Sequence, residues 1–425
     1  MEPVNGVVPP ERMQIDCLQG MQVSKAAAEH YAKRPVKADG CHEFISRPVQ
    51  RVGEDAQARY YMRDILVSLA NGFTLISPGG PFDGDTAYHD TAWGGASYAF
   101  RKPYLYPKKS CVAYAVLTKS IDAPTAMREV DTGSKSVYAL EFRRADGKYA
   151  TAVWTTRGKA ALKVEGASGG TVSMMGRERS FGGLFGKNLV LASEEPSYLM
   201  TDDPIVKLSV VERRYEETAI GKGATVACAL DDLSSVTAEP DPQYKNTRLQ
   251  CLPVLTPSSA IKVSSTVDSD KGACLQLAID PKSPCESKFL SEYTTLRFGT
   301  PVLLPKDATE AGLWVKGDSG CGQVRYELED AKGNVYKNLQ TGSGAVDFYD
   351  ADMRQSFDFD GWNYLHVNFA KRHNMWTKTV YKSPDWMAPP LRVNAITVSL
   401  NRFVPHLDGM AAVKGEVRIS GLGGR

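Results

Sequence analysis

The chain has 425 residues, too many for one ordinary hydrophobic core, and predicts two to four domains of ~100 to 200 residues each. Its 51 basic and 49 acidic residues nearly cancel, which leaves no one-sided field to attract nucleic acid or an anionic membrane. We therefore expect neither of these as a partner.

The start of the chain has neither a basic nor an apolar segment of the kind found in signal peptides, and no run approaches ~18 apolar residues. This predicts no membrane anchor. It predicts a cytoplasmic protein as the sequence is given, or an extracellular or periplasmic one if the natural protein starts further upstream.

The eight cysteines include no Cys-x-x-Cys pair and no nearby histidine pair, so we expect no metal site. The sequence has no phosphate loop and no dinucleotide fingerprint, so we expect no cofactor. Scattered thiols in a chain without an export signal are typically reduced and structural. The alternative is a disulfide among the last five cysteines, if the natural protein is secreted.

The first 120 residues predict alternating helices and short strands. Apolar residues recur along one side of a helix from Asp55 to Asn71. Shorter helical patterns cover Val23 to Lys33 and Cys111 to Lys119, and candidate strands cover Val36 to Phe44 and Phe73 to Ile76. This order is typical of a parallel sheet with helical crossovers.

A small β-sandwich is predicted next. Ser136 to Arg143 and Tyr149 to Trp154 alternate apolar and polar residues on either side of Asp146-Gly147, which is a hairpin signal. Further short strands are expected at Ala161 to Val164, Thr171 to Met174, Leu189 to Ala192 and Ser197 to Met200. They give about six strands that end near Asp203.

A second β region follows the polar stretch Glu212 to Gly223, and we expect it to be a jelly roll. Its expected strands are Gly312 to Val315, Gln323 to Glu329, Gly361 to Phe369, Asn394 to Asn401 and Glu416 to Ile419. In the second of these, Val324, Tyr326 and Leu328 face one way and Arg325, Glu327 and Glu329 the other. The predicted fold class is therefore mainly β with an N-terminal α/β part.

Three stretches in the first part resemble the end of the (β/α)8 barrel in retaining glycoside hydrolases of the large barrel clan. They are CHEFISRP, VGEDAQARYYMRDILVSLANGF and YPKKSCVAYAVLTKSID, and YALEFRRADGKYATAVWTTRG resembles the small β-sandwich that follows such barrels. LWVKGDSGCGQVRYELEDAKGN and FDFDGWNYLHVNF resemble galactose-binding-like jelly rolls. The resemblance implies a partial barrel over residues 1–120, a small β-sandwich over 121–205 and a jelly roll over 206–425.

By this resemblance, Glu43 is the catalytic nucleophile and His42 lies beside the substrate. Retaining glycosidases need two carboxylates about 5 to 5.5 Å apart. The acid/base partner belongs three βα units earlier, or roughly 90 residues, whereas only 40 residues separate Glu2 from Glu43. We therefore expect the acid/base to lie outside this chain, and a missing N-terminal part or a partner chain to complete the barrel. The alternative for Glu43 is a solvated glutamate in a loop.

Other candidate sugar-binding residues combine flat rings with polar groups. The loop from Asp83 to Arg101 is expected to contact substrate through Asp83, Asp85, Tyr88, His89 and Trp93. Otherwise it is a long surface loop whose aromatic residues pack beneath it. In the last domain, Trp376 and Trp386 are the expected exposed rings.

Strand alternation places Trp362, Tyr364 and His366 on one face, which is either core or a ligand platform. Gly317-Asp318-Ser319-Gly320 copies the tetrapeptide around a protease nucleophile, but these are ordinary turn residues, and we expect a turn.

The predicted function is that of a glycoside-hydrolase-like protein that acts on or binds an oligo- or polysaccharide, with an incomplete catalytic barrel. The alternative is a non-catalytic carbohydrate-binding or structural β module.

Overall fold

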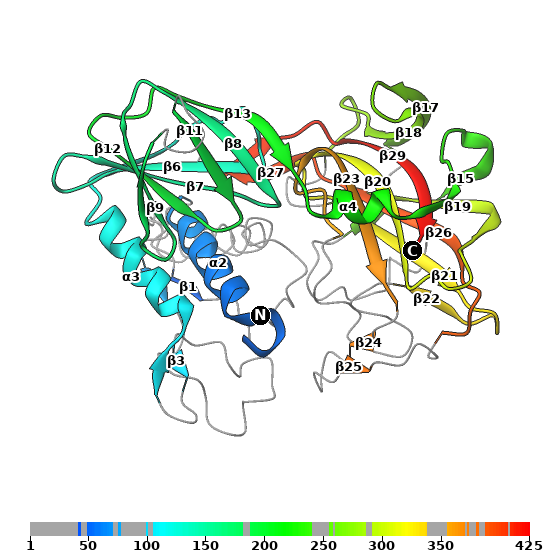
Figure 1. Ribbon diagram of the computed structural model, residues 1–425. Coiled ribbons are helices and arrows are strands. Elements are labelled where there is room, and N and C mark those ends of the chain that lie inside the picture. The colour runs from blue at the N-terminus through cyan, green and yellow to red at the C-terminus, as the bar shows by residue number, and fades with distance from the viewer. Residues whose placement is uncertain are drawn as a thin grey trace, which may run out of the picture. The chain divides into compact units, whose positions relative to one another are not determined.

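The computed structural model describes residues 41–43, 49–70, 75–77, 99–100, 105–181, 188–239, 255–257, 260–285, 291–337, 355–369, 372–373, 380–381, 387–406 and 409–425. The chain forms two compact units, and it passes from one to the other between Tyr215 and Glu216. We call them the N-terminal unit, which also includes Pro405–Ala411, and the C-terminal unit. Each unit is built mainly of strands (Figure 1), which confirms the prediction of a mainly β protein.

The first described elements of the N-terminal unit are a parallel strand pair and the long helix between its two strands. Strand β1 (Cys41–Glu43) pairs with β2 (Leu75–Ser77), and α2 (Val49–Ala70) lies between them in the sequence. The predicted helix is confirmed, although it starts earlier and is interrupted at Gly53, where φ is 77°. A closed barrel of this kind has eight parallel strands. The described residues of the N-terminal unit contain one parallel pair, so they do not show the predicted partial barrel.

Two antiparallel sheets make up the rest of this unit. Sheet I has the order β10-β9-β12-β7-β6-β5, and sheet II has the order β11-β8-β13. The strands of sheet I are β5 (Ala126–Glu129), β6 (Val137–Arg143), β7 (Tyr149–Thr155), β9 (Gly169–Ser173), β10 (Glu178–Ser180) and β12 (Ser197–Thr201). Those of sheet II are β8 (Lys159–Glu165), β11 (Leu189–Ser193) and β13 (Lys207–Arg214). The predicted hairpin is β6–β7, and its turn glycine, Gly147, has φ 85°.

Sheet I is covered on both faces, because successive residues of its strands place apolar side chains on opposite faces of the sheet. Tyr138, Leu140 and Phe142 pack against α2 and α3 (Lys109–Ile121), while Val137 and Ala139 belong to a second core with sheet II. Figure 1 shows α2 and α3 lying against this sheet. Sheet I therefore lies between two hydrophobic cores, one shared with the two helices and one shared with sheet II.

The C-terminal unit is a sandwich of two mostly antiparallel sheets. Sheet III has the order β17-β18-β29-β20-β23, with β14 also pairing with β29, and sheet IV has the order β15-β19-β26-β21-β22, with β16 also pairing with β19. The strands of sheet III are β14 (Thr225–Cys228), β17 (Ile261–Asp268), β18 (Gly272–Ile279), β20 (Glu310–Asp318), β23 (Asp360–Asn368) and β29 (Glu416–Gly424). Those of sheet IV are β15 (Val236–Glu239), β16 (Leu255–Pro257), β19 (Ser291–Leu303), β21 (Gln323–Glu329), β22 (Val335–Lys337) and β26 (Arg392–Leu400). The C-terminal unit also contains helix α4 (Glu217–Lys222), the 3₁₀ turn η2 (Leu233–Ser235) and the strand pair β24–β25 (Arg372–His373, Val380–Tyr381).

Two short strand pairs lie elsewhere. The pair β3–β4 (Ala99–Phe100, Tyr106–Pro107) belongs to the N-terminal unit, and the pair β27–β28 (Phe403–His406, Gly409–Ala412) contains the segment Pro405–Ala411 of that unit.

The core of the C-terminal unit lies between sheets III and IV. Val324, Tyr326 and Leu328 of β21 are at most 1% exposed, as the alternation predicted. The Tyr326 hydroxyl donates to the Leu365 carbonyl on β23 at 2.8 Å, which ties the two sheets together across the core. The outer faces of the two sheets are therefore the places where polar side chains collect.

Candidate functional site

The residues that the sequence singled out for catalysis are described only in part. His42 and Glu43 lie in β1, and Glu43 is in register with Ser77 of β2, but their side chains lie outside the described part of the structure. Asp83, Asp85, Tyr88, His89, Trp93, Trp376 and Trp386 also lie outside the described residues. The roles assigned to these residues stay predictions.

The protease-like tetrapeptide is a turn between the two sheets of the C-terminal unit. Asp318 ends β20 in sheet III, and β21 of sheet IV begins at Gln323. The Asp318 carboxylate accepts the Gly320 N–H at 2.8 Å, and the Ser319 hydroxyl hydrogen-bonds to Asp360. Ser319 is 1% exposed, so it is not presented to a substrate and the turn prediction is confirmed.

The end of the β17–β18 hairpin folds over the outer face of sheet III. Strand β18 pairs with β29 only from Leu275 onwards, so Gly272 and Asp268 lie beyond that pairing. In a flat sheet β17 would be about 19 Å from β23, four strands away. The Asp268 carboxylate nevertheless accepts a hydrogen bond from Trp362 Nε1 on β23 at 2.9 Å. The hairpin end therefore crosses the sheet instead of continuing its edge.

Asp268 is held there by donors from three other strands. Its Oδ2 accepts from Lys316 Nζ on β20 and Arg418 Nη1 on β29, each at 2.8 Å, and its Oδ1 accepts from Trp362 and from the Asp270 N–H at 2.9 Å. Burial alone would raise the pKa of Asp268. The hydrogen bonds from Lys316, Asp270 and Trp362 outweigh burial and hold that pKa well below its usual range. A carboxylate with a low pKa does not act as a general acid, and both oxygens of Asp268 are already engaged by donors.

Aromatic rings continue the same face. Trp314 on β20 and Tyr364 on β23 are in register and meet edge to face, with ring centroids 5.5 Å apart. Lys271 from the hairpin end places its ammonium 3.3 Å from the Trp314 ring centroid, and burial lowers the pKa of Lys271. Tyr364 also stacks on His366 at 6.1 Å, which fits the prediction that these two rings share a face with Trp362.

Helix α4 covers the middle of this face. A Cβ on Gly221 would lie 2.5 Å from Tyr364 Cγ and 2.7 Å from Trp314 Cζ2, so only glycine allows the helix to sit so close. Asn363 donates to Glu217 of the same helix at 3.2 Å. Trp314 and Tyr364 are therefore buried from the outside.

The accessible part of the face lies beside α4. The Lys316 side chain is 36% exposed, that of Arg418 is 26% exposed and Trp362 is partly exposed. We call Lys316, Trp362 and Arg418, with Asp268 behind them, the charged-aromatic face. It combines a flat ring with two cationic donors whose positions Asp268 fixes, an arrangement suited to binding a polar ligand.

The outer face of sheet IV is also polar, but its central side chains are buried. Arg325 is 8% exposed and Thr397 6%. Arg297 joins Glu239 and Glu327 through hydrogen bonds of 2.6 and 3.1 Å. The Arg297 and Glu239 side chains are each 39% exposed, so this network is partly open to solvent, but its charged groups are paired with one another.

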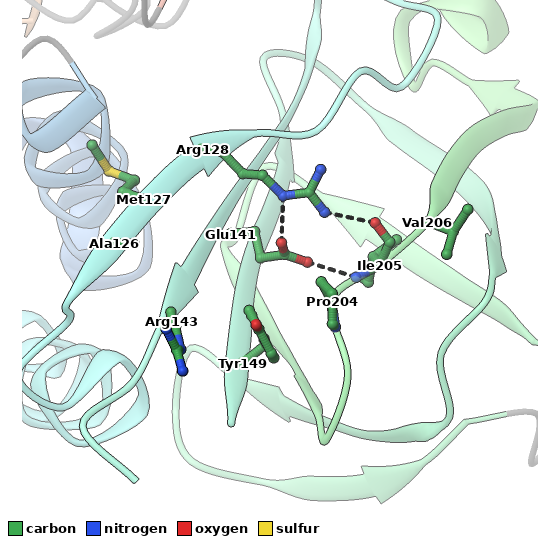
Figure 2. A pocket seen from close by; sticks show the side chains of 9 residues that line it. All are labelled: Ala126, Met127, Arg128, Glu141, Arg143, Tyr149, Pro204, Ile205 and Val206. Atoms are coloured by element: carbon green, nitrogen blue, oxygen red, sulfur yellow. Dashed lines mark hydrogen bonds and ion pairs between the residues drawn. The ribbon is translucent and has the colours of Figure 1, made fainter. Parts of the chain in front are cut away.

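The N-terminal unit holds a pocket of about 450 Å³. It is lined by Ala126, Met127, Arg128, Glu141, Arg143, Tyr149, Pro204, Ile205 and Val206 (Figure 2). Among the described residues, no group of three or more His, Cys, Asp or Glu side chains is arranged to hold a metal ion. No helix in the described part of the chain is long and apolar enough to cross a membrane.

Sequence reasoning identified Trp362 but missed Asp268, Lys316 and Arg418. These three residues are far apart in the chain. Lys316 and Arg418 are in register on the paired strands β20 and β29, and Asp268 reaches them because the hairpin end bends over sheet III. The remaining signal was the alternation of β20, where Trp314 and Lys316 lie opposite the apolar Leu313 and Val315.

Comparisons with known proteins give only distant likenesses. No model of a known protein family matches the sequence, and no curated protein matches it. Among solved structures, the family 11 carbohydrate-binding module of a cellulase from Clostridium thermocellum is similar at 11% identity, with a TM-score of 0.22 over 48% of this chain and 95% of that one. The enzymatically active domain of tailspike protein 4 of bacteriophage CBA120 is similar at 10% identity and a TM-score of 0.22, over 46% of this chain and 20% of that one.

An isomalto-dextranase of Arthrobacter globiformis, complexed with panose, is similar at 11% identity and a TM-score of 0.20. The match covers 86% of this chain and 47% of the enzyme. This chain therefore spans about half of that enzyme's length and a fifth of the tailspike domain's. TM-scores of this size carry no argument about a ligand, so the functional conclusion depends on the described residues themselves.

Proposed function

We propose that this protein binds an oligo- or polysaccharide without cleaving it, through the charged-aromatic face of sheet III. The observation that carries the proposal is the convergence of the partly exposed Trp362, Lys316 and Arg418 on one buried carboxylate. Sugars have apolar C–H faces that stack on aromatic rings and hydroxyl groups that accept hydrogen bonds from cationic side chains.

The pre-organisation of this face supports binding. Asp268 uses both of its oxygens to orient the three side chains, so little side-chain entropy is lost when a ligand arrives. Trp362 and the Lys316 and Arg418 side chains are partly exposed on this face, and Glu416 lies 3.8 Å from Arg418 Nη2.

The test is affinity electrophoresis of the full chain in gels that contain mixed-linked β-glucan, galactan, dextran or polygalacturonate. Trp362→Ala should weaken the retardation by at least about tenfold, since the ring is the main apolar contact. The matched control is Tyr114→Ala, which removes an aromatic ring that is 39% exposed on α3 of the N-terminal unit. Absence of retardation of the unaltered chain, or equal retardation of Trp362→Ala, would contradict the proposal.

A catalytic role for Glu43 stays a prediction, and it requires a second carboxylate about 5 to 5.5 Å away. For this chain we expect little or no release of reducing sugar from the same polysaccharides. Release that Glu43→Gln abolishes would replace the binding proposal by a hydrolytic one.

A further inference from the structure

The pocket of the N-terminal unit lies at one end of the interface between sheets I and II. Strands β5, β6 and β7 form one side, and the segment Pro204–Val206 forms the other (Figure 2). Its volume of about 450 Å³ falls within the range of sites that hold small molecules, roughly 300 to 1,000 Å³. The charged-aromatic face belongs to the other unit, so this pocket is a separate candidate.

A closed set of hydrogen bonds forms the back of the pocket. Glu141, 2% exposed, accepts from Arg128 Nε at 2.6 Å and from the Ile205 N–H at 2.7 Å. Arg128 Nη2 donates to the Ile205 carbonyl at 2.7 Å. Arg128 and Glu141 thus hydrogen-bond to the carbonyl and the N–H group of Ile205, and each oxygen of the Glu141 carboxylate already has a donor. Glu141 is therefore structural and does not repel an incoming anion as a free carboxylate would.

A second guanidinium, that of Arg143, lies beside this set and has no acidic partner among the described residues. Arg143 lies two residues after Glu141 on the same face of β6 and diagonal to Arg128, in register with Ala126 on β5 and Tyr149 on β7. Its side chain is exposed, and it makes no ion pair or side-chain hydrogen bond to another described residue. The pocket thus has two arginines for one glutamate, which is a net positive charge.

The other lining groups are mostly apolar. Ala126, Pro204 and Val206 contribute exposed carbon surface, and Val206 is 76% exposed. Tyr149 adds a ring whose hydroxyl makes no hydrogen bond to another described residue, and Figure 2 shows it next to Pro204. Exposed carbon surface beside a cation that has no acidic partner among the described residues suits a ligand with an anionic end and an apolar body.

We propose that this pocket binds a small organic carboxylate with an apolar or aromatic body. The carboxylate accepts hydrogen bonds from the Arg143 guanidinium, whose planar fork matches it in two-point geometry. The body of the ligand lies on Tyr149, Pro204 and Val206. A sugar acid fits less well, because its hydroxyl groups would meet carbon surface that offers them few partners.

The test is calorimetric titration of the full chain at low salt and pH 7. The probe is 4-hydroxybenzoate, and the uncharged match is 4-hydroxybenzamide. Galacturonate is the sugar-acid probe. We expect 4-hydroxybenzoate to bind at least about tenfold more tightly than the other two.

Two variants and a control locate the site. Arg143→Ala should weaken 4-hydroxybenzoate binding at least about tenfold, and Arg143→Lys should restore only part of it because the point charge lacks the fork. Arg177→Ala, which removes an exposed arginine outside the pocket lining, should leave binding unchanged.

No binding of 4-hydroxybenzoate, equal binding of the amide, or full affinity in Arg143→Ala would overturn the proposal. Tighter binding of galacturonate than of 4-hydroxybenzoate would contradict the claim that the ligand has an apolar body. None of these outcomes bears on polysaccharide binding by Trp362, which lies in the other unit.

Discussion

Sheet I of the N-terminal unit and sheet III of the C-terminal unit both carry tryptophan on a face that turns away from their partner sheet. In sheet I that face is sealed by α2 and α3, and Trp154 is fully buried and stacked on Tyr138 with ring centroids 5.1 Å apart. In sheet III a short helix and a hairpin end cover only part of the face, and Trp362 stays partly exposed. The same strand alternation therefore yields core in one unit and a binding surface in the other, depending on what covers the sheet.

The sealed face should be the more sensitive to truncation. Trp154→Ala removes a ring at 0% exposure and should lower the free energy of unfolding of the N-terminal unit by about 3–5 kcal/mol. Trp362→Ala, at the open face, should lower that of the C-terminal unit by much less. Denaturant unfolding followed by circular dichroism measures both, and equal losses would break the comparison.

The hairpin end should be held by its carboxylate. Asp268→Ala leaves Lys316 and Arg418 without their shared partner, and because both are partly exposed, water replaces some of the loss. We expect a cost of about 1–2 kcal/mol in thermal or denaturant unfolding.

The matched control for Asp268 is an exposed ion pair. Glu212 lies 2.7 Å from Arg214 with both side chains more than half exposed, so Glu212→Ala should cost less than about 0.5 kcal/mol. A similar small cost for Asp268→Ala would mean that other contacts hold the hairpin end in place.

The pKa of a second aspartate of the C-terminal unit, Asp318, is shifted in the opposite direction to that of Asp268. Burial raises the pKa of Asp318 to about 6, despite hydrogen bonds from the backbone N–H groups of Gly320 and Glu416. The folded protein therefore holds this proton more tightly than the unfolded chain, whose aspartates titrate near about 3.9. The associated stability is fully present below about pH 4, falls as the pH rises to about 6, and stays level above that.

Thermal unfolding from pH 4 to 7 measures this dependence, with Asp318→Asn as the comparison. The stability of the variant relative to the unaltered chain should rise with pH between about pH 4 and 6, by at most ~1.4 kcal/mol per pH unit, which is the slope for one proton. A difference that is independent of pH would contradict the raised pKa.

Local patterns in the sequence predicted the elements better than the site. The helix from Asp55, the Asp146-Gly147 hairpin and the alternation around Tyr326 depend on neighbouring residues, and the structure has all three. The stretch Glu212 to Gly223 reads as polar, yet it contains the end of β13 and the whole of α4.

The assembly of the charged-aromatic face depends on contacts between distant segments. The donors Lys316 and Arg418 are 102 residues apart, and no periodicity within β17 signals that its end leaves the plane of the sheet. Only the structure brings Asp268 to them. The sequence did identify Trp362, because strand alternation predicts the face of the strand on which a side chain lies. Alternation does not predict which other elements cover that face.

The central claim is that sheet III, not sheet I, provides the ligand-binding surface. Hydrogen–deuterium exchange of the full chain, with and without the polysaccharide that retards it most in the gels, tests this directly. We predict slower exchange in β20, β23 and β29 and no change in sheet I. Protection confined to the N-terminal unit, or no protection anywhere with a polysaccharide that does bind, would contradict the claim.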